Sequence, residues 1–202
     1  MDIIVSTRNE HKFSEISKIL KSSKIKALSL KNFPGTPKVK EDGKTFSDNA
    51  CKKALKIARI TKRLTVADDS GLEVNALDNA PGIYSARFSG RSADYESNNK
   101  KLLKLLKDLP KSKRKARFVC CVAVADEQGI IGVVEGKCLG MIAFAEKGKK
   151  GFGYDPLFIC NEYNKTFAEL SPAIKNKISH RAKAFAKAKK TILKYIEKKD
   201  KK

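Results

Sequence analysis

In Leu64-Thr65-Val66-Ala67-Asp68-Asp69-Ser70-Gly71, a run of apolar and β-branched residues meets two adjacent carboxylates. Such a run is typical of a buried strand. Adjacent carboxylates at the end of a buried strand are unfavourable unless a cation holds them. We predict a strand over 64–67 that ends abruptly at Asp68, with Gly71 allowing a sharp turn. A solvated turn or a helix cap is the alternative interpretation of the acidic pair.

Strands and helices alternate on the N-terminal side of this stretch. Residues 3–5 form a short apolar run, and apolar residues recur at helical spacing over 13–20. Residues 24–44 contain two prolines and two glycines, which predicts a short strand followed by an irregular loop. Thr45-Phe46-Ser47-Asp48 matches the capping-box pattern, so we predict that a helix begins there.

The C-terminal side begins with a loop and a helix. Residues 78–90 are rich in glycine and small polar residues, which predicts a long irregular loop. Leucines at helical spacing over 102–109 predict an amphipathic helix that Pro110 ends. Ser179 is predicted to cap a final helix.

A hairpin is predicted near residue 128. The β-rich runs 118–125 and 130–135 are separated by Asp126-Glu127-Gln128-Gly129, a turn-forming sequence. Strands and helices alternate in the first half of the chain, and hairpins occupy the second. We therefore predict an α/β protein with a mixed central sheet, folded as one domain over residues 1–202.

The composition is that of a globular chain, with 41% hydrophobic and 33% charged residues among 202. No apolar run approaches the ~20 residues that span a bilayer, and the first apolar run is too short for the core of a signal peptide. We expect a cytoplasmic protein without membrane segments. The five cysteines form no C-x-x-C motif and are odd in number, so we interpret them as reduced core thiols rather than zinc ligands.

The formal net charge of +22 indicates anionic partners. Much of the excess lies in 111–117 and 183–202, and residues from about 197 to 202 form a lysine-rich tail. A module that binds RNA would interleave aromatic with basic residues, and neither segment does so. We favour a solvated lysine-rich surface and do not expect nucleic acid as a partner. A basic nucleic-acid-binding protein without catalysis is the alternative.

The motif Ser6-Thr7-Arg8-Asn9-Glu10-His11-Lys12 lies between the first predicted strand and helix. Backbone N–H groups at a helix N-terminus, with hydroxyl and ammonium donors beside them, suit a polyphosphate. The motif lacks the spacing of a Walker A loop. An ordinary helix cap is the alternative.

The pair Asp68-Asp69 is the second candidate for chemistry. The counter-charge that we expect beside it is Mg²⁺, a hard ion that binds carboxylate and phosphate oxygens and keeps several waters. Glu41, in the preceding loop, is a candidate third carboxylate.

Two more motifs lie near the C-terminus. Gly151-Phe152-Gly153-Tyr154-Asp155-Pro156 is not a dinucleotide fingerprint, because proline fills the third glycine position. Its glycines allow close backbone approach to a ligand, and its aromatic rings suit stacking on a base. An aromatic β-turn is the alternative.

Lys175 and Ser179-His180-Arg181 offer donors to a purine carbonyl or a phosphate, although a lone histidine is often structural.

Together these motifs resemble the inosine triphosphate pyrophosphatase family, over residue 3 to about residue 190. The resemblance rests on Ser6–Lys12, Thr45–Ala50, Ala67–Leu77, Pro81–Phe88, Gly151–Pro156 and Ile178–Arg181. It implies an elongated two-lobed mixed α/β fold with the active site in a cleft between the lobes, in a homodimer. One departure is visible: Asp48 stands where the family usually has glutamate.

The resemblance also implies the roles of individual residues. Asp69 is the general base, and Glu41 and Asp69 bind Mg²⁺ with assistance from Asp68. The implied substrate-binding residues are Thr7, Arg8, Asn9, Glu10, His11, Lys12, Lys53, Ser70, Phe152, Gly153, Tyr154, Asp155, Lys175, His180 and Arg181. The implied reaction is hydrolysis of deaminated purine nucleoside triphosphates (ITP, dITP and XTP) to the monophosphate and pyrophosphate. A pyrophosphatase directed at another nucleotide, such as a modified pyrimidine, is a further alternative.

Overall fold

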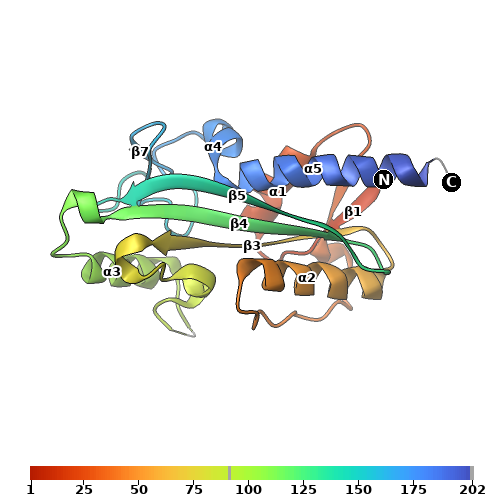
Figure 1. The fold of residues 1–202 in the computed structure, drawn as a ribbon, viewed down its shortest axis with the longest axis horizontal. Coiled ribbons are helices and arrows are strands. Elements are labelled where there is room, and N and C mark those ends of the chain that lie inside the picture. The colour runs from red at the N-terminus through yellow and green to blue at the C-terminus, as the bar shows by residue number, and fades with distance from the viewer. Residues whose placement is uncertain (91, 201–202) are drawn as a thin grey trace. The chain divides into compact units, whose positions relative to one another are not determined.

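The computed structural model describes residues 1–90 and 92–200 and contains a seven-stranded sheet of order β2-β1-β3-β4-β5-β6-β7 (Figure 1). The strands are β1 (Asp2–Val5), β2 (Lys26–Ser29), β3 (Thr65–Val74), β4 (Lys115–Ala125), β5 (Ile130–Ile142), β6 (Phe158–Cys160) and β7 (Lys165–Thr166). The helices are α1 (Glu10–Leu20), α2 (Phe46–Thr61), α3 (Tyr95–Leu105), α4 (Pro172–Ile178) and α5 (His180–Lys199). The sheet is mixed, because β1 pairs parallel with β2 and β3 whereas β6 pairs antiparallel with β5 and β7. The predicted α/β class is confirmed.

The chain divides into two compact units. Unit 1 comprises residues 1–69, 120–136 and 181–202, and unit 2 comprises residues 70–119 and 137–180. The strands β3, β4 and β5 each contribute residues to both units. The cleft that the family resemblance implies stays a prediction.

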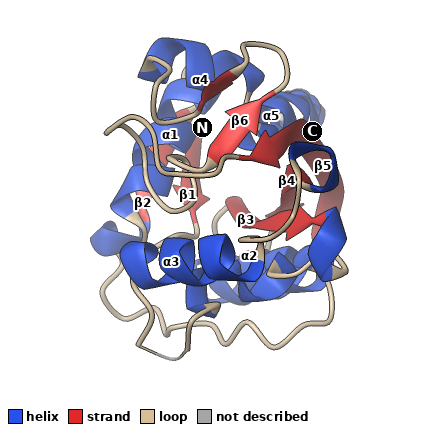
Figure 2. Ribbon diagram, turned by 90° about the vertical axis from the view of Figure 1, so that its left-hand side faces the viewer, coloured by secondary structure: helices blue, strands red, loops and turns tan. Residues whose placement is uncertain are grey.

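Unit 1 is built around the parallel strands β1, β2 and β3. Helices α1 and α5 cover one face, where Ile16 and Phe185 pack with the strand residues Ile3 and Val5. Helix α2 covers the opposite face, where Ile57 packs against Ile4 (Figures 1 and 2). Different helices cover the two faces of the sheet, which leaves the ends of the strands free for polar side chains.

Two helix starts are capped by side chains, and the cap at Thr45 was predicted. Asn9 caps α1, and Thr45 caps α2 in a capping box in which the Asp48 carboxylate accepts from the Thr45 N–H at 3.0 Å. The shortened side chain of Asp48 therefore reaches the helix N-terminus.

Unit 2 has a separate core that gathers around the aromatic rings of Phe118, Phe158 and Phe167. Helix α3 contributes Leu102 to it, and Leu106, the residue after the helix, packs in the same core. Figures 1 and 2 place α3 and α4 on opposite sides of the strands of this unit. The loop predicted over 78–90 contains a short 3-10 helix, Gly82–Arg87, which was not predicted.

The prediction that the strand beginning at residue 64 ends at Asp68 was wrong. Strand β3 continues through Asp68, Asp69 and Gly71 to Val74, and Gly71 lies within it rather than in a turn. The acidic pair is neither a solvated turn nor a helix cap, because Asp68 is 2% and Asp69 7% exposed. Cations from distant parts of the chain hold these carboxylates, so the strand does not have to turn toward solvent.

Other boundaries also differ from prediction. Helix α3 ends at Leu105, five residues before Pro110, so the proline does not end it. Helix α4 was not predicted, whereas α5 begins at His180, directly after Ser179, as predicted for the final helix. Residues 197–199 of the predicted tail are helical, and residues 201–202 lie outside the described part.

All five cysteines are free thiols; four are buried, as predicted for core residues, whereas Cys51 is only half-buried. In the described residues, no helix is both long and apolar enough to cross a membrane.

Candidate active site

The carboxyl end of β1 is the point from which the site is built. Helix α1 leads from β1 to β2 on one face of the sheet, and α2 leads from β2 to β3 on the other. From β1 the chain goes first to β2 on one side and then to β3 on the other side of β1. The point between β1 and β3 is a topological switch point, where ligands of open α/β sheets bind. Val5, the last residue of β1, pairs with Val66, so Asp68 and Asp69 lie just beyond the end of β1.

The loop from β1 to α1 presents a capped helix N-terminus at this edge. The Asn9 side chain accepts from the Lys12 N–H at 3.1 Å, and the Thr7 hydroxyl accepts from the Asn9 N–H at 3.2 Å. The remaining N–H groups of the first turn and the macrodipole favour an anion. The capped helix start was the alternative interpretation of this motif, and its role as a polyphosphate site stays a prediction.

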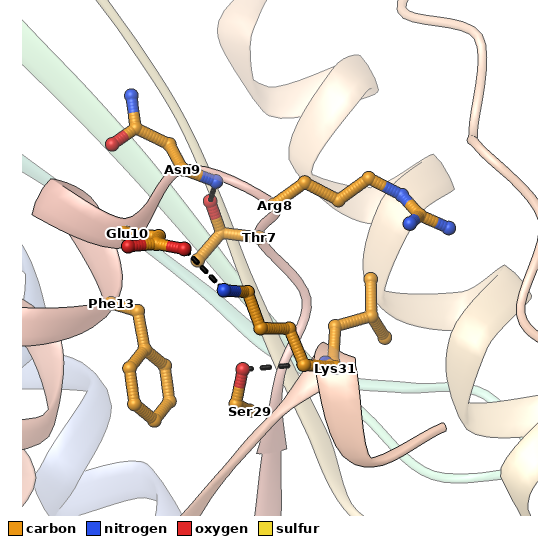
Figure 3. Close-up of a pocket in the computed structure, with 8 residues that line it drawn as sticks. Thr7, Arg8, Asn9, Glu10, Phe13, Ser29 and Lys31 are labelled. Atoms are coloured by element: carbon orange, nitrogen blue, oxygen red, sulfur yellow. Dashed lines mark hydrogen bonds and ion pairs between the residues drawn. The ribbon is translucent and has the colours of Figure 1, made fainter. Parts of the chain in front are cut away.

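A cavity of about 510 Å³ opens beside this loop (Figure 3). Figure 3 shows Lys31 pointing toward Glu10, with which it forms an ion pair, while Arg8 extends away from both. The Arg8 guanidinium donates to the Thr36 carbonyl at 2.7 Å. The lining residues are Thr7, Arg8, Asn9, Glu10, Phe13, Ser29, Leu30 and Lys31.

Asp68 is held by two cations. Its Oδ2 lies 3.0 Å from Lys12 Nζ and 3.6 Å from Arg181 Nε, and Arg181 in turn contacts Glu15 at 2.7 Å. Burial raises the pKa of Asp68, but the charges of Lys12 and Arg181 outweigh it and hold that pKa well below its ordinary value. Oδ1 of Asp68 is buried and has no hydrogen-bond partner among the described residues.

Asp69 has a different environment. Its Oδ2 accepts from Asn49 Nδ2 at 2.9 Å, and its Oδ1 lies 3.9 Å from Lys53 Nζ. Burial raises the pKa of the Asp69 carboxyl above its ordinary value, because the nearby Lys53 and Lys12 charges and the Asn49 hydrogen bond only partly offset it. Adjacent carboxylates whose environments move their pKa values in opposite directions are typical of acid–base sites.

Lys53 connects Asp69 to Glu41. Its buried ammonium forms an ion pair with Glu41 Oε1, which lies in the loop before α2. Burial lowers the pKa of Lys53, but Asp68, Glu41 and Asp69 outweigh it and raise that pKa above its ordinary value. The carboxylates of Glu41 and Asp69 therefore converge on one positive charge.

The described residues contain no group of three or more histidine, cysteine and acidic side chains arranged to hold a metal ion. The predicted trio Glu41, Asp68 and Asp69 thus does not form a complete protein cage. Mg²⁺ is usually held by one or two carboxylates, substrate phosphates and waters, so a complete cage is not required.

In unit 2, Asp155 joins two of the predicted substrate-binding residues. Its Oδ2 accepts from the Phe152 N–H at 2.8 Å and from Lys175 Nζ at 2.5 Å. The Lys175 ammonium also lies 4.8 Å from the centre of the Phe152 ring. Gly151 has φ +79°, and a Cβ there would lie 2.0 Å from the Asp155 carboxylate, so glycine is required at this position. Asp155 holds Lys175 and the Phe152 backbone in place.

Tyr154 does not fit its predicted role as a ring for stacking on a base. The side chain is 5% exposed and packs in the core of unit 2, and its hydroxyl donates to the Ser85 carbonyl at 2.9 Å. Burial raises the pKa of this phenol. Phe152 is only partly buried, so it is the aromatic residue of this motif that is available to a ligand.

The structure brings together most predicted residues within each unit. Ser70 is half-buried in β3, and His11 is exposed on α1 with Glu10. His180 is 4% exposed and stacks on Phe118.

Two contacts were not predicted: that of Asn49 with Asp69, and that of Glu15 with Arg181, the cation beside Asp68. Asn49 stands inside a motif that carried the family resemblance, whereas Glu15 and Arg181 are 166 positions apart and gave no local signal.

These features define a mixed α/β protein with a buried acidic pair and a capped helix N-terminus at the carboxyl edge of its parallel strands. The model of the Ham1 family matches residues 3–191, and the chain belongs to this family.

Three known proteins illustrate the similarity. The dITP/XTP pyrophosphatase of Desulforamulus reducens is 51% identical over 188 residues, which cover 93% of this chain and 94% of the relative. A HAM1 protein from Coxiella burnetii has a similar structure, with a TM-score of 0.87, 35% identity, and coverage of 96% of this chain and 99% of that one. A nucleoside-triphosphatase / dITP/XTP pyrophosphatase from Mycobacterium abscessus has a TM-score of 0.75 at 42% identity, with coverage of 93% and 98%.

Proposed function

We propose that the chain hydrolyses deaminated purine nucleoside triphosphates (ITP, dITP and XTP) to the nucleoside monophosphate and pyrophosphate, as one catalytic domain. The observation that carries this proposal is the buried pair of Asp68 and Asp69, whose pKa values shift in opposite directions beside a loop suited to phosphate. The names of its relatives, dITP/XTP pyrophosphatases, support the substrate class.

Asp69 is the general base of the proposed reaction. It accepts a proton from a water that attacks the α-phosphorus, and pyrophosphate leaves. Its raised pKa places the base closer to neutral pH, where proton transfer is most effective. Lys12 and Lys53, which already face the acidic pair, offset the charge on the phosphates. No covalent intermediate is required.

Mg²⁺ fits the acidic side chains around Lys53. The carboxylates of Glu41 and Asp69 both face the Lys53 ammonium, which supports a shared cation site, and Asp68, the residue before Asp69, has an unpartnered buried Oδ1. Glu41 and Asp69 would hold the ion with assistance from Asp68. When bound, Mg²⁺ neutralises phosphate oxygens and lowers the pKa of a bound water.

The purine base is assigned to side chains of unit 2. Phe152 offers a ring face, Lys175 offers an ammonium that Asp155 fixes, and His180 offers a ring N–H. Donors aimed at a 6-keto oxygen are left unpaired by the amine of adenine, a difference of about 10⁴ in the most favourable cases. Arg181, by contrast, is engaged by Asp68 and Glu15, so we assign it to holding Asp68.

A panel of nucleoside triphosphates with Mg²⁺, scored for pyrophosphate release, tests the proposal. We expect rapid release from ITP, dITP and XTP and slow release from ATP. Comparable rates for ATP, GTP and ITP would refute the specificity. Preference for a modified pyrimidine would favour another substrate, and binding of RNA or DNA without release would favour the nucleic-acid alternative. Asp69→Asn should lower kcat by about 10²–10⁴ while substrate still binds.

The family resemblance also supports a homodimer located in the cytoplasm. Sedimentation velocity of the purified chain tests the dimer, and a monomer at micromolar concentration would contradict it.

A further inference from the structure

The imidazole of His180 is stacked on an aromatic core. Its ring lies 4.6 Å from the Phe118 ring centre at an interplanar angle of 12°, and 6.5 Å from the Phe167 ring at the same angle. Phe118 and Phe167 are themselves stacked at 5.8 Å and 3°. The three rings are therefore nearly parallel. They come from β4, from the residue after β7 and from the first turn of α5.

A fourth ring, that of Phe158, packs against the two phenyl rings of this stack. Phe158 is tilted by 57° against Phe118 and by 55° against Phe167, at centroid distances of 4.6 and 5.0 Å. Phe158 and Phe167 are fully buried, and Phe118 is 7% exposed. Phe118 thus lies parallel to the His180 ring and packs against two fully buried phenyl rings.

The torsion that sets the plane of a histidine ring is broad and gives little orientation by itself. A hydrogen bond from a ring N–H, however, weakens steeply when its angle departs far from linear. A histidine that reads a carbonyl oxygen therefore requires something else to hold its plane. Parallel contact with a fixed aromatic ring supplies that restraint.

We propose that Phe118 is a positioning residue for His180: its ring fixes the imidazole plane and thereby sets the selectivity for 6-keto purines. This inference rests on the proposed function, in which His180 contacts the base. Phe118 itself does not touch the substrate. Its contribution should be seen in discrimination between bases, which a residue that only fills the core would not change.

The matched pair Phe118→Leu and Phe158→Leu tests the proposal. Both variants remove one phenyl ring from the same core. The first removes the ring that stacks on His180 at 4.6 Å, and the second removes a ring that is tilted by 57° against Phe118. We expect Phe118→Leu to lower the ratio of kcat/KM for dITP over dATP roughly tenfold, the scale of a small misplacement of a binding group. Phe158→Leu should lose stability and leave that ratio within about twofold.

Proton NMR of the imidazole supplies a readout that does not depend on activity. The chain has two histidines, and exposed His11 serves as the internal reference for His180. Ring currents from Phe118 should shift the His180 ring protons upfield in the wild type. That shift should be lost in Phe118→Leu and retained in Phe158→Leu.

The outcomes separate the two claims. Failure of the wild type to cleave dITP refutes the proposed function, whereas the NMR comparison still tests the positioning of the ring. An unchanged His180 shift in Phe118→Leu, or an unchanged dITP to dATP ratio, overturns the inference. An equal loss of selectivity in both variants also overturns it, because the effect would then come from the core as a whole.

Discussion

Replacement of Asp68 by asparagine should destabilise the fold, whereas the same replacement of Asp69 should not. Asp68→Asn and Asp69→Asn are isosteric changes at adjacent positions of β3, and both side chains are buried. Because the folded state lowers the pKa of Asp68, it favours the ionised form of that carboxyl. Because the folded state raises the pKa of Asp69, it favours the neutral form of that one. The two variants are therefore controls for each other.

The size of the Asp68 effect follows from what its carboxylate holds. A group whose folded pKa is lowered stabilises the fold at neutral pH, and that stability is lost as pH falls through the folded pKa. Asp68→Asn removes this charge and leaves Lys12 and Arg181 with less compensation. Breaking a buried ion pair in this way costs about 3–5 kcal/mol. At about 2–4 °C per kcal/mol for a chain of this size, Tm should fall by roughly 6–20 °C.

Asp69→Asn should leave Tm at or above the wild-type value. An asparagine oxygen can still accept from Asn49 Nδ2, and the variant removes a negative charge that the folded state disfavours. Thermal and urea unfolding at pH 7, followed by circular dichroism, measures both variants. Equal losses in the two variants, or a larger loss in Asp69→Asn, would refute the assignment of different roles.

Three further perturbations test other parts of the site and the fold. The acid limb of the kcat/KM profile should lie above the ordinary aspartate pKa of about 3.9, because protonation of Asp69 removes the base; a limb at or below that value contradicts its role. Glu41→Gln should raise the Mg²⁺ concentration for half-maximal activity by about tenfold or more; an unchanged titration would exclude Glu41 as a ligand. Arg114→Met should cost about 3 kcal/mol in urea unfolding, because the buried guanidinium donates to three backbone carbonyls; a loss below about 1 kcal/mol would show that water replaces it.

Local patterns were sufficient to predict much of the fold. The capping box at Thr45 and the turn after Ala125 depend on residues within four positions of each other, and both are present in the structure. The end of β3 was mispredicted because its determinants are not local. Lys12, Lys53 and Arg181 come from three different helices, and their charges allow the strand to continue through the acidic pair.

The candidate site shows the same division. Its phosphate loop and acidic pair were identified from short motifs, whereas the orientation of individual side chains was not. Tyr154 is drawn into the core by its hydrogen bond to Ser85, 69 positions away. Arg181 is turned toward Asp68 by a contact that no sequence spacing indicates. Such choices depend on which unit's core a side chain joins, and a motif does not contain that information.

The central claim is hydrolysis at the α-phosphorus of a deaminated purine nucleotide. One reaction tests it most directly: equimolar dITP and dATP with Mg²⁺ in ¹⁸O-labelled water, with the products analysed by mass spectrometry. Attack on the α-phosphorus predicts dIMP that carries one ¹⁸O, unlabelled pyrophosphate, and little dAMP. Label in pyrophosphate or inorganic phosphate, or equal amounts of dAMP and dIMP, would contradict the account.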